Sequence, residues 1–189
     1  MITKNLKSKN KILEEFKNKV IVTNKSLGID LDYLSNLILP MQYESTDNII
    51  AEDKDVYGRN IVIQEKAYQA FKQMQKAAAI ESNLDLQILS AFRSVEYQKN
   101  LIINKLKKDL KLKDILAVLA PPGFSEHHTG RALDLTTSKL KTLTSEFDQT
   151  EEFLWLENNA DKFNFVLSYP KNNAYGMIYE PWHWCFVHT

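Results

Sequence analysis

Two things are scarce in this chain: cysteine, and an excess of charge of either sign. Cys185 is the single cysteine, so no intramolecular disulfide can form, which is consistent with a reducing compartment. The chain has 24 Lys and Arg residues and 24 Asp and Glu residues, and therefore no net charge. Because nucleic-acid-binding proteins usually carry a basic excess, we expect no nucleic acid among the partners.

Long apolar runs are absent as well. No apolar stretch of the sequence is long enough to cross a bilayer, so we expect no transmembrane segment. The basic residues 1–11 lead into Ile12–Lys17 without the apolar core of a signal peptide. These absences favour a cytoplasmic location; if export used a segment outside the sequence, the periplasm or cell envelope would be the alternative.

The chain has enough apolar residues for a folded core. Hydrophobic residues make up 44% of its 189 residues and aromatic residues 11%, which argues against disorder. A chain of this length fits one domain. We predict an N-terminal helical extension over residues 1–20 and a single domain over residues 21–189, and we expect a monomer.

Hydrophobic periodicity and capping residues predict a mixture of helices and strands. Apolar residues at helical spacing indicate helices over residues 5–18 and 64–82. Ser94 is a typical N-cap for a further helix that is expected to run to Leu106. Thr150 is a typical N-cap for another helix, expected from Glu151 to Lys162.

The segments between the helices are expected to be loops and strands. We expect a loop over residues 24–40 and a polar segment with a turn at Gly58 over residues 47–60. Strands are expected at residues 84–92, 131–136, 163–169, 177–179 and 182–187. This irregular order favours an α+β domain, in which helices pack around an antiparallel sheet that carries the functional site.

Two segments of the C-terminal third carry the candidate chemistry. The first supplies His127 and, seven positions later, Asp134, and the second supplies His183. Two histidines and one aspartate make a three-ligand zinc site that leaves one coordination position for water. Glu180, three residues before His183, can act on that water as a general base. This set is typical of a hydrolase that cleaves amide bonds.

These residues lie in motifs that resemble the zinc D-Ala-D-Ala carboxypeptidase family, the VanY-like group of LAS-type metallopeptidases (peptidase family M15). The family pattern S-x-H-x-x-G-x-A-x-D followed by E-x-W-H is met at all its fixed positions, namely Ser125, His127, Gly130, Ala132, Asp134, Glu180, Trp182 and His183. A third segment, close to the family's S-G-Y-R-S-x-E-Y-Q, appears at residues 90–98 and departs from it at Ala91 and Phe92. Phe92 lacks the hydroxyl of tyrosine, so it cannot make a hydrogen bond that this hydroxyl would make in the family.

The resemblance implies roles for further residues. Arg93 is expected to contact an anion, either the scissile carbonyl oxygen as charge develops or the terminal carboxylate of the substrate. A structural salt bridge at a helix start is the alternative for Arg93. Gln98 and Ser125 are expected to line the same substrate pocket, and Tyr169 is expected to contact substrate.

The place of Glu180 poses a geometric question. In a regular strand, side chains at positions i and i+3 point to opposite faces, which would separate Glu180 from His183. Pro181 lies between them and indicates a turn or bulge that redirects Glu180 towards the metal.

The resemblance implies a zinc-dependent carboxypeptidase that removes the terminal D-alanine from peptidoglycan stem peptides or muropeptides. An L,D-carboxypeptidase acting on tetrapeptides is the close alternative. A non-catalytic, zinc-dependent binder of wall peptides and an endopeptidase are further alternatives. Loss of Glu180 or Arg93 would favour the binder, and an added wall-binding module would favour the endopeptidase; the sequence keeps both residues and shows no such module.

Overall fold

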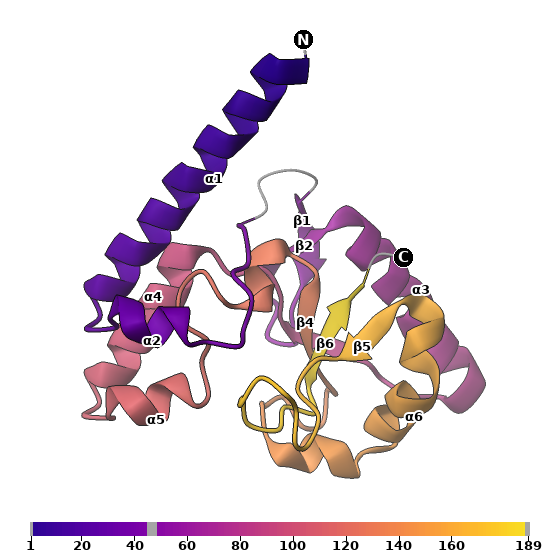
Figure 1. The fold of residues 1–189 in the computed structure, drawn as a ribbon. Helices are drawn as coiled ribbons and strands as arrows, with labels where there is room; N and C mark the ends of the chain where they lie inside the picture. The colour runs from indigo at the N-terminus through magenta and orange to yellow at the C-terminus, as the bar shows by residue number, and fades with distance from the viewer. Residues whose placement is uncertain (1, 45–48, 188–189) are drawn as a thin grey trace. The chain divides into compact units, whose positions relative to one another are not determined.

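The computed structural model describes residues 2–44 and 49–187, and describes side chains over residues 10–44 and 53–187. The chain divides into two compact units, each built from two separate stretches. The first unit comprises Met1–Tyr43 and Ser94–Ser125, and the second comprises Glu44–Arg93 and Glu126–Thr189. Figure 1 shows the course of the chain and labels elements of both units.

The first unit is helical. It contains α1 (Ile2–Lys25), α2 (Leu31–Ser35), α4 (Val95–Leu106) and α5 (Leu112–Leu116). Its core is formed by Leu27, Ile29, Ile102, Ile115 and Leu116. As expected, Ser94 caps α4, because its hydroxyl oxygen accepts a hydrogen bond from the backbone N–H of Tyr97 at 3.0 Å.

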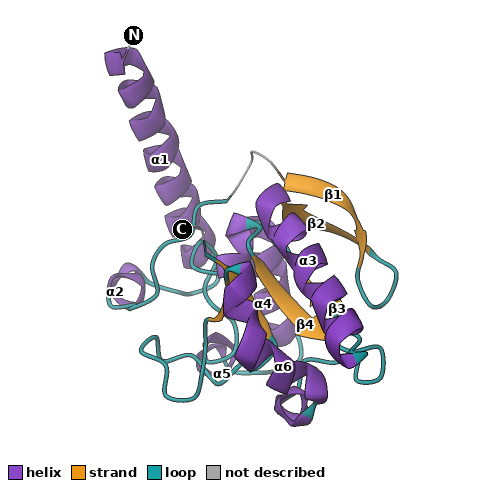
Figure 2. Ribbon diagram, turned by 90° about the vertical axis from the view of Figure 1, so that its right-hand side faces the viewer, coloured by secondary structure: helices purple, strands orange, loops and turns teal. Residues whose placement is uncertain are grey.

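The second unit is built on a four-stranded antiparallel sheet with the strand order β3-β4-β6-β5. The strands are β3 (Gln87–Ser90), β4 (Ala132–Thr136), β5 (Phe165–Leu167) and β6 (His183–Phe186). Two longer helices, α3 (Glu65–Ser82) and α6 (Glu151–Asn159), share one hydrophobic core with these strands. Figure 2 shows both helices beside the sheet. The fold is therefore α+β with an antiparallel sheet, as the sequence predicts.

Side-chain alternation gives the central strands two different faces. Leu133 and Leu135 of β4 and Trp184 and Phe186 of β6 belong to the core shared with α3 and α6. The residues between them therefore point to the other face, and that face carries Asp134 of β4 and His183 of β6. All of these positions are buried. The same two strands thus supply both the core and a buried polar face.

Several boundaries differ from the sequence-based expectation. The first helix extends beyond residues 5–18, and residues 31–35 form α2 within a segment expected to be a loop. The helix expected to reach Lys162 ends at Asn159 and continues as the 3-10 helix η3 (Ala160–Phe163). The strand expected at residues 177–179 is wrong, because these residues form no strand. The domain boundary after residue 20 stays a prediction.

The polar segment at residues 47–60 contains one strand of a hairpin that the sequence analysis missed. Within the described residues, β1 (Ile49–Lys54) pairs with β2 (Asn60–Gln64) in antiparallel register, with an irregularity between Ala51 and Asp53. The turn at Gly58 is present, and Gly58 has a positive φ of 78°. None of the helices described is both long and apolar enough to span a membrane.

A buried aspartate organises the hairpin turn. Asp55 is 6% exposed, and its carboxylate accepts hydrogen bonds from the backbone N–H groups of Tyr57 and Arg59, both at 2.9 Å, and from the Arg59 guanidinium. Burial alone raises the pKa of Asp55, but these hydrogen bonds outweigh burial and bring the pKa below its ordinary value. The ionised carboxylate therefore stabilises the folded turn.

We expect Asp55→Asn to lower the free energy of unfolding by about 1–3 kcal/mol near neutral pH, because an amide cannot accept the same set of hydrogen bonds. The folded pKa lies below the unfolded one, so the contribution of the carboxylate is fully present above the unfolded pKa and is lost as pH falls through the folded pKa. Urea unfolding of both proteins, followed by circular dichroism from neutral to acidic pH, measures the difference. A difference that does not shrink in acid would contradict this account.

Candidate metal centre

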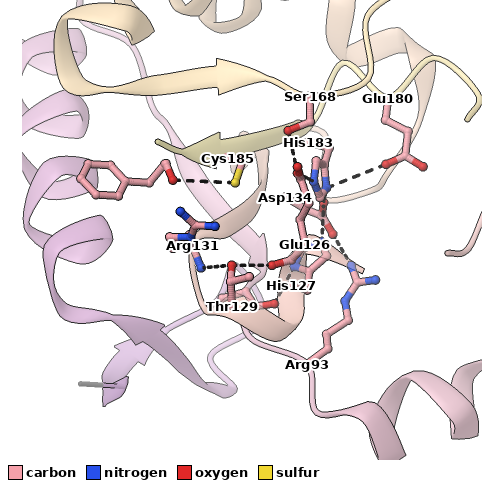
Figure 3. Close-up of polar contacts among 12 residues, drawn as sticks. Arg93, Glu126, His127, Thr129, Arg131, Asp134, Ser168, Glu180, His183 and Cys185 are labelled. Atoms are coloured by element: carbon pink, nitrogen blue, oxygen red, sulfur yellow. Dashed lines mark hydrogen bonds and ion pairs between the residues drawn. The ribbon is translucent and has the colours of Figure 1, made fainter. Parts of the chain in front are cut away.

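Three side chains of the second unit converge on one point. His127 lies in the 3-10 helix η1 (Glu126–Thr129), Asp134 in β4 and His183 in β6. One potential ligand atom from each lies within 4.8 Å of the others. Asp134 Oδ1 is 3.2 Å from His127 Nε2 and 3.1 Å from His183 Nδ1. The three residues are 1–3% exposed, and Figure 3 shows their side chains directed at one another.

The sheet and a tight turn bring these residues together. Asp134 and His183 are register partners in the antiparallel pairing of β4 with β6, so their side chains lie side by side on the same face. Gly130 connects η1 to β4 with a positive φ of 69°. A Cβ at Gly130 would lie 3.2 Å from the backbone nitrogen of Gln64, which donates a hydrogen bond to the Gly130 carbonyl. Glycine therefore suits this position for both its backbone conformation and the close approach.

The second nitrogen of each histidine has its own partner. His127 Nδ1 lies 2.6 Å from the carbonyl oxygen of Ala91; a carbonyl only accepts, so Nδ1 carries the proton and Nε2 is the bare nitrogen in the neutral ring. His183 Nε2 lies 2.9 Å from Glu126 Oε2. In each ring the nitrogen that faces Asp134 is thus the one left to bind a metal.

The donor set fits a zinc ion. Two imidazole nitrogens and one carboxylate oxygen are donors found in catalytic zinc sites, where three protein ligands leave a position for water. Ligand atoms about 2.1 Å from an ion in a tetrahedron lie roughly 3.4 Å from one another. The distances of 3.1 and 3.2 Å to Asp134 Oδ1 are close to that separation.

The charge states of the three residues follow from burial and from their neighbours. Burial, reinforced by the nearby Arg93 charge, lowers the pKa of His127 to about 4, which keeps its ring neutral at neutral pH. Burial alone would raise the pKa of Asp134, but the charge of Arg93 and the hydrogen bond with His183 hold it well below its ordinary range. Burial also lowers the pKa of His183, but its hydrogen bonds with Asp134 and Glu126 outweigh this and raise it to about 10. Binding of a cation at His183 Nδ1 therefore requires release of a proton.

Arg93 is fixed beside the three residues. Its guanidinium forms an ion pair with Asp134 Oδ2 and donates from Nε to the Ser90 hydroxyl at 3.0 Å. Its backbone N–H donates to the His127 carbonyl at 3.2 Å, and its own carbonyl lies 2.6 Å from His128 Nδ1. The sequence left open an anion contact or a structural salt bridge, and the geometry contains the salt bridge, with Asp134 as its partner.

Glu180 lies in a turn, and its carboxylate approaches the three converging residues. The His183 N–H donates to the Glu180 carbonyl at 3.0 Å, so Glu180, Pro181 and Trp182 form a turn and β6 begins only at His183. Glu180 Oε2 lies 3.9 Å from His183 Nδ1, as the Pro181 argument expects. Burial is the main cause that raises the pKa of Glu180 to about 7, against the lowering effect of His183.

The remaining predicted site residues fall into two groups. Tyr169 is 3% exposed, its ring centroid lies 4.8 Å from that of His183, and its carbonyl accepts the Glu180 N–H at 3.0 Å. Gln98 and Ser125 belong to the first unit and are both buried. The Gln98 side chain donates to the Ala120 carbonyl at 2.9 Å. Their place in a substrate pocket stays a prediction.

Sequence reasoning missed Glu126 and Ser168. Glu126 directly precedes His127, and Oε2 of its carboxylate accepts a hydrogen bond from the Ser168 hydroxyl at 2.6 Å besides contacting His183. Burial alone raises the pKa of Glu126, but the hydrogen bonds with His183 and Ser168 outweigh it and lower the pKa. A carboxylate next to a candidate ligand was the available signal, but nothing in the local sequence points to a partner 57 positions away.

Comparisons with known proteins agree on one family. The family model VanY, described as D-alanyl-D-alanine carboxypeptidase, matches residues 60–189. The Bacillus subtilis (strain 168) protein named "Putative carboxypeptidase YodJ" is 35% identical over 157 residues, which cover 79% of this chain and 56% of that protein. A D-alanyl-D-alanine carboxypeptidase of Enterococcus faecium is 29% identical over 179 residues, covering 86% of this chain and 54% of that protein. The chain therefore spans about half the length of these curated relatives.

A solved structure supports the fold. The structure of the LdcB LD-carboxypeptidase, described as revealing the molecular basis of peptidoglycan recognition, is similar to this chain with a TM-score of 0.68 and 30% sequence identity. The similarity covers 78% of this chain and 71% of that chain.

We expect Asp134→Asn to weaken zinc binding by more than about 100-fold, beyond the roughly 10–100-fold typical of residues that only support a ligand. The neutral amide replaces the anionic oxygen that both histidines face. Metal content after dialysis and competition with a chromogenic chelator measure the loss. Asp161→Asn, a substitution at an exposed aspartate, serves as the matched control, and equal zinc affinity of the Asp134 variant and the wild type would remove Asp134 from the ligand set.

Proposed function

Because the chain belongs to the VanY family of D-alanyl-D-alanine carboxypeptidases, we propose that it is a zinc-dependent carboxypeptidase that removes the terminal D-alanine from peptidoglycan stem peptides. One observation carries the proposal beyond family membership. A buried carboxylate, Glu180, lies 3.9 Å from His183 at the point where His127, Asp134 and His183 converge. The three converging residues would hold a metal ion, and Glu180 would lie beside it as a base.

The metal would be held by His127 Nε2, Asp134 Oδ1 and His183 Nδ1. When bound, a zinc ion polarises the scissile carbonyl and lowers the pKa of a water molecule to about 7. The protein contributes the geometry. Because both histidines are anchored through their second nitrogens and Asp134 through Arg93, the ligands are held in place before a metal or substrate arrives.

Glu180 is suited to transfer a proton from the attacking water to the leaving group. Its carboxylate is buried, and its pKa is raised to about 7, mainly by burial. A carboxylate with a pKa near the working pH can accept a proton from the attacking water and then donate it to the nitrogen of the leaving D-alanine. The carbon–nitrogen bond breaks as that proton is transferred, and the products are a shortened peptide and free D-alanine.

Arg93 is suited to bind a negatively charged oxygen of the substrate. Its side chain is 11% exposed, and its guanidinium already pairs with Asp134. A guanidinium has five N–H donors, so Arg93 can orient Asp134 and also donate to an oxygen of the substrate. By resemblance to the family, Gln98, Ser125 and Tyr169 would line the substrate pocket.

A second candidate is favoured by a specific observation. The structure of the LdcB LD-carboxypeptidase is similar to this chain, which supports L,D-carboxypeptidase activity on tetrapeptides. The two activities share the metal, the base and the departing D-alanine. They differ in the stereochemistry of the residue that supplies the scissile carbonyl, so only substrate choice separates them.

We expect Glu180→Gln to lower kcat by about 10²–10⁴-fold, the usual contribution of a general acid–base residue, while zinc content stays at the wild-type level. Steady-state kinetics and metal analysis of the same preparations measure both quantities. Glu81→Gln, a substitution at an exposed glutamate of α3, is the matched control. Unchanged turnover in the Glu180 variant would remove this residue as the base.

Mass spectrometry of the zinc-loaded protein with muropeptide pentapeptide and tetrapeptide tests the activity itself. Loss of one alanine from the pentapeptide alone, abolished by EDTA, is the expected result. Loss from the tetrapeptide alone would assign the protein as an L,D-carboxypeptidase. Zinc binding without loss from either peptide would contradict the carboxypeptidase proposal and favour an endopeptidase or a non-catalytic binder of wall peptides.

A further inference from the structure

The Glu126 carboxylate is placed to act on His183 rather than on substrate. Glu126 lies in η1, directly before His127, yet Oε2 contacts residues of two other segments. It lies 2.9 Å from His183 Nε2 and 2.6 Å from the Ser168 hydroxyl oxygen. Its side chain is 21% exposed, against 3% for His183. Figure 3 shows Glu126, Ser168 and His183 in this chain of contacts, with Asp134 beside His183.

The direction of these hydrogen bonds is fixed by their chemistry. An ionised carboxylate only accepts hydrogen bonds, and a carboxyl group of ordinary pKa near 4 is ionised at neutral pH. Ser168 therefore donates its O–H to Glu126, and His183 donates from Nε2. Nδ1 lies 3.1 Å from Asp134 Oδ1, and a cation that binds at Nδ1 displaces the proton there. The neutral imidazole that results has a single N–H, and Glu126 holds that proton at Nε2.

The two histidines consequently present different nitrogens. His127 is anchored through Nδ1 by the Ala91 carbonyl and presents Nε2. His183 is anchored through Nε2 by Glu126 and presents Nδ1. The anchors also differ in charge, because one is a neutral carbonyl and the other an anion. A hydrogen bond to an anion is roughly twice as strong as a neutral one and makes the ring a stronger electron donor.

We propose that Glu126, held by Ser168, is a positioning residue that selects Nδ1 of His183 as the metal-binding nitrogen and strengthens its bond to the metal. The inference rests on the metal site proposed above and assigns no contact between Glu126 and substrate. It predicts that metal affinity, and not only turnover, depends on a residue outside the ligand set.

Zinc affinity of the folded protein tests the proposal. Competition with a chromogenic chelator gives the dissociation constant for the wild type, Glu126→Ala, Glu126→Gln, Ser168→Ala and the control Glu81→Gln. We expect Glu126→Ala to weaken zinc binding by about 10–100-fold. Glu126→Gln keeps the size and one acceptor oxygen but loses the charge, so its loss is expected to be smaller, about 10-fold. Ser168→Ala is expected to lose less zinc affinity than either Glu126 variant. The control should bind zinc as the wild type does.

Long-range ¹H–¹⁵N NMR of the histidine rings supplies a readout that a purely structural role would not change. In the zinc-loaded wild type, His183 should show a protonated Nε2 and a metal-bound Nδ1. In the Glu126 variants, the Nε2–H signal should broaden or shift, because the proton has lost its anionic acceptor. Circular dichroism of each variant establishes that the fold is kept.

The outcomes separate this inference from the proposed function. Wild-type zinc affinity in Glu126→Ala would overturn the positioning role and leave the metal site intact; if that variant does not fold, wild-type affinity in Glu126→Gln would overturn it equally. Coordination of His183 through Nε2 would also overturn it. Failure of the wild type itself to bind zinc would overturn the metal site and this inference together, a result that the variants alone cannot produce.

Discussion

The buried carboxylate of Asp134 is the interaction on which the rest of the site depends. It is 1% exposed, and an ionised carboxylate in such a place is unfavourable unless it is paired. Two partners provide the compensation: Arg93 pairs with Oδ2, and His183, whose pKa is raised to about 10, pairs with Oδ1. The neutral ring of His127 presents Nε2 to the same oxygen, Oδ1. Each partner is in turn held by a further group, so the negative charge of one side chain organises a network that includes η1, β3, β4 and β6.

This network and the hydrophobic core share the same strands. In β4 and β6, every second side chain packs in the core with α3 and α6, and the alternate side chains carry the polar cluster. Burying Leu133, Leu135, Trp184 and Phe186 therefore fixes the position of Asp134 and His183 on the opposite face. A rigid sheet is a better support for a metal site than a loop, because its backbone positions are set by many cooperative contacts. All three proposed ligands and Glu180 lie within the second unit.

Much of this arrangement could be predicted from the sequence, and the reasons are local. The caps Ser94 and Thr150 and the periodicity of α3 are short-range signals, and the helices begin where these signals place them. The candidate ligands were identified from motifs that resemble those of a known family, and Pro181 correctly indicated the turn before β6. Where the signal was weak, the prediction failed: residues 177–179 have strand-forming side chains but no pairing partner in the described sheet.

What could not be predicted depends on distant contacts. The hairpin of β1 and β2 was hidden by a polar composition, because strand pairing depends on cross-strand partners as much as on residue type. The ion pair between Arg93 and Asp134 joins residues 41 positions apart, and the Glu126 contact with His183 spans 57. Such contacts are set by the tertiary fold, and the sequence around either partner does not specify them.

The pairing of Asp134 with His183 also connects metal binding to the accuracy of folding. A slip of one residue between β4 and β6 would place Trp184 or Trp182 opposite Asp134 and turn the His183 side chain to the other face. Only the correct alignment brings the two side chains together, so an ion bound there stabilises that alignment and none of its neighbours. A bound metal would therefore favour the correct alignment of β4 with β6 over the alignments shifted by one residue.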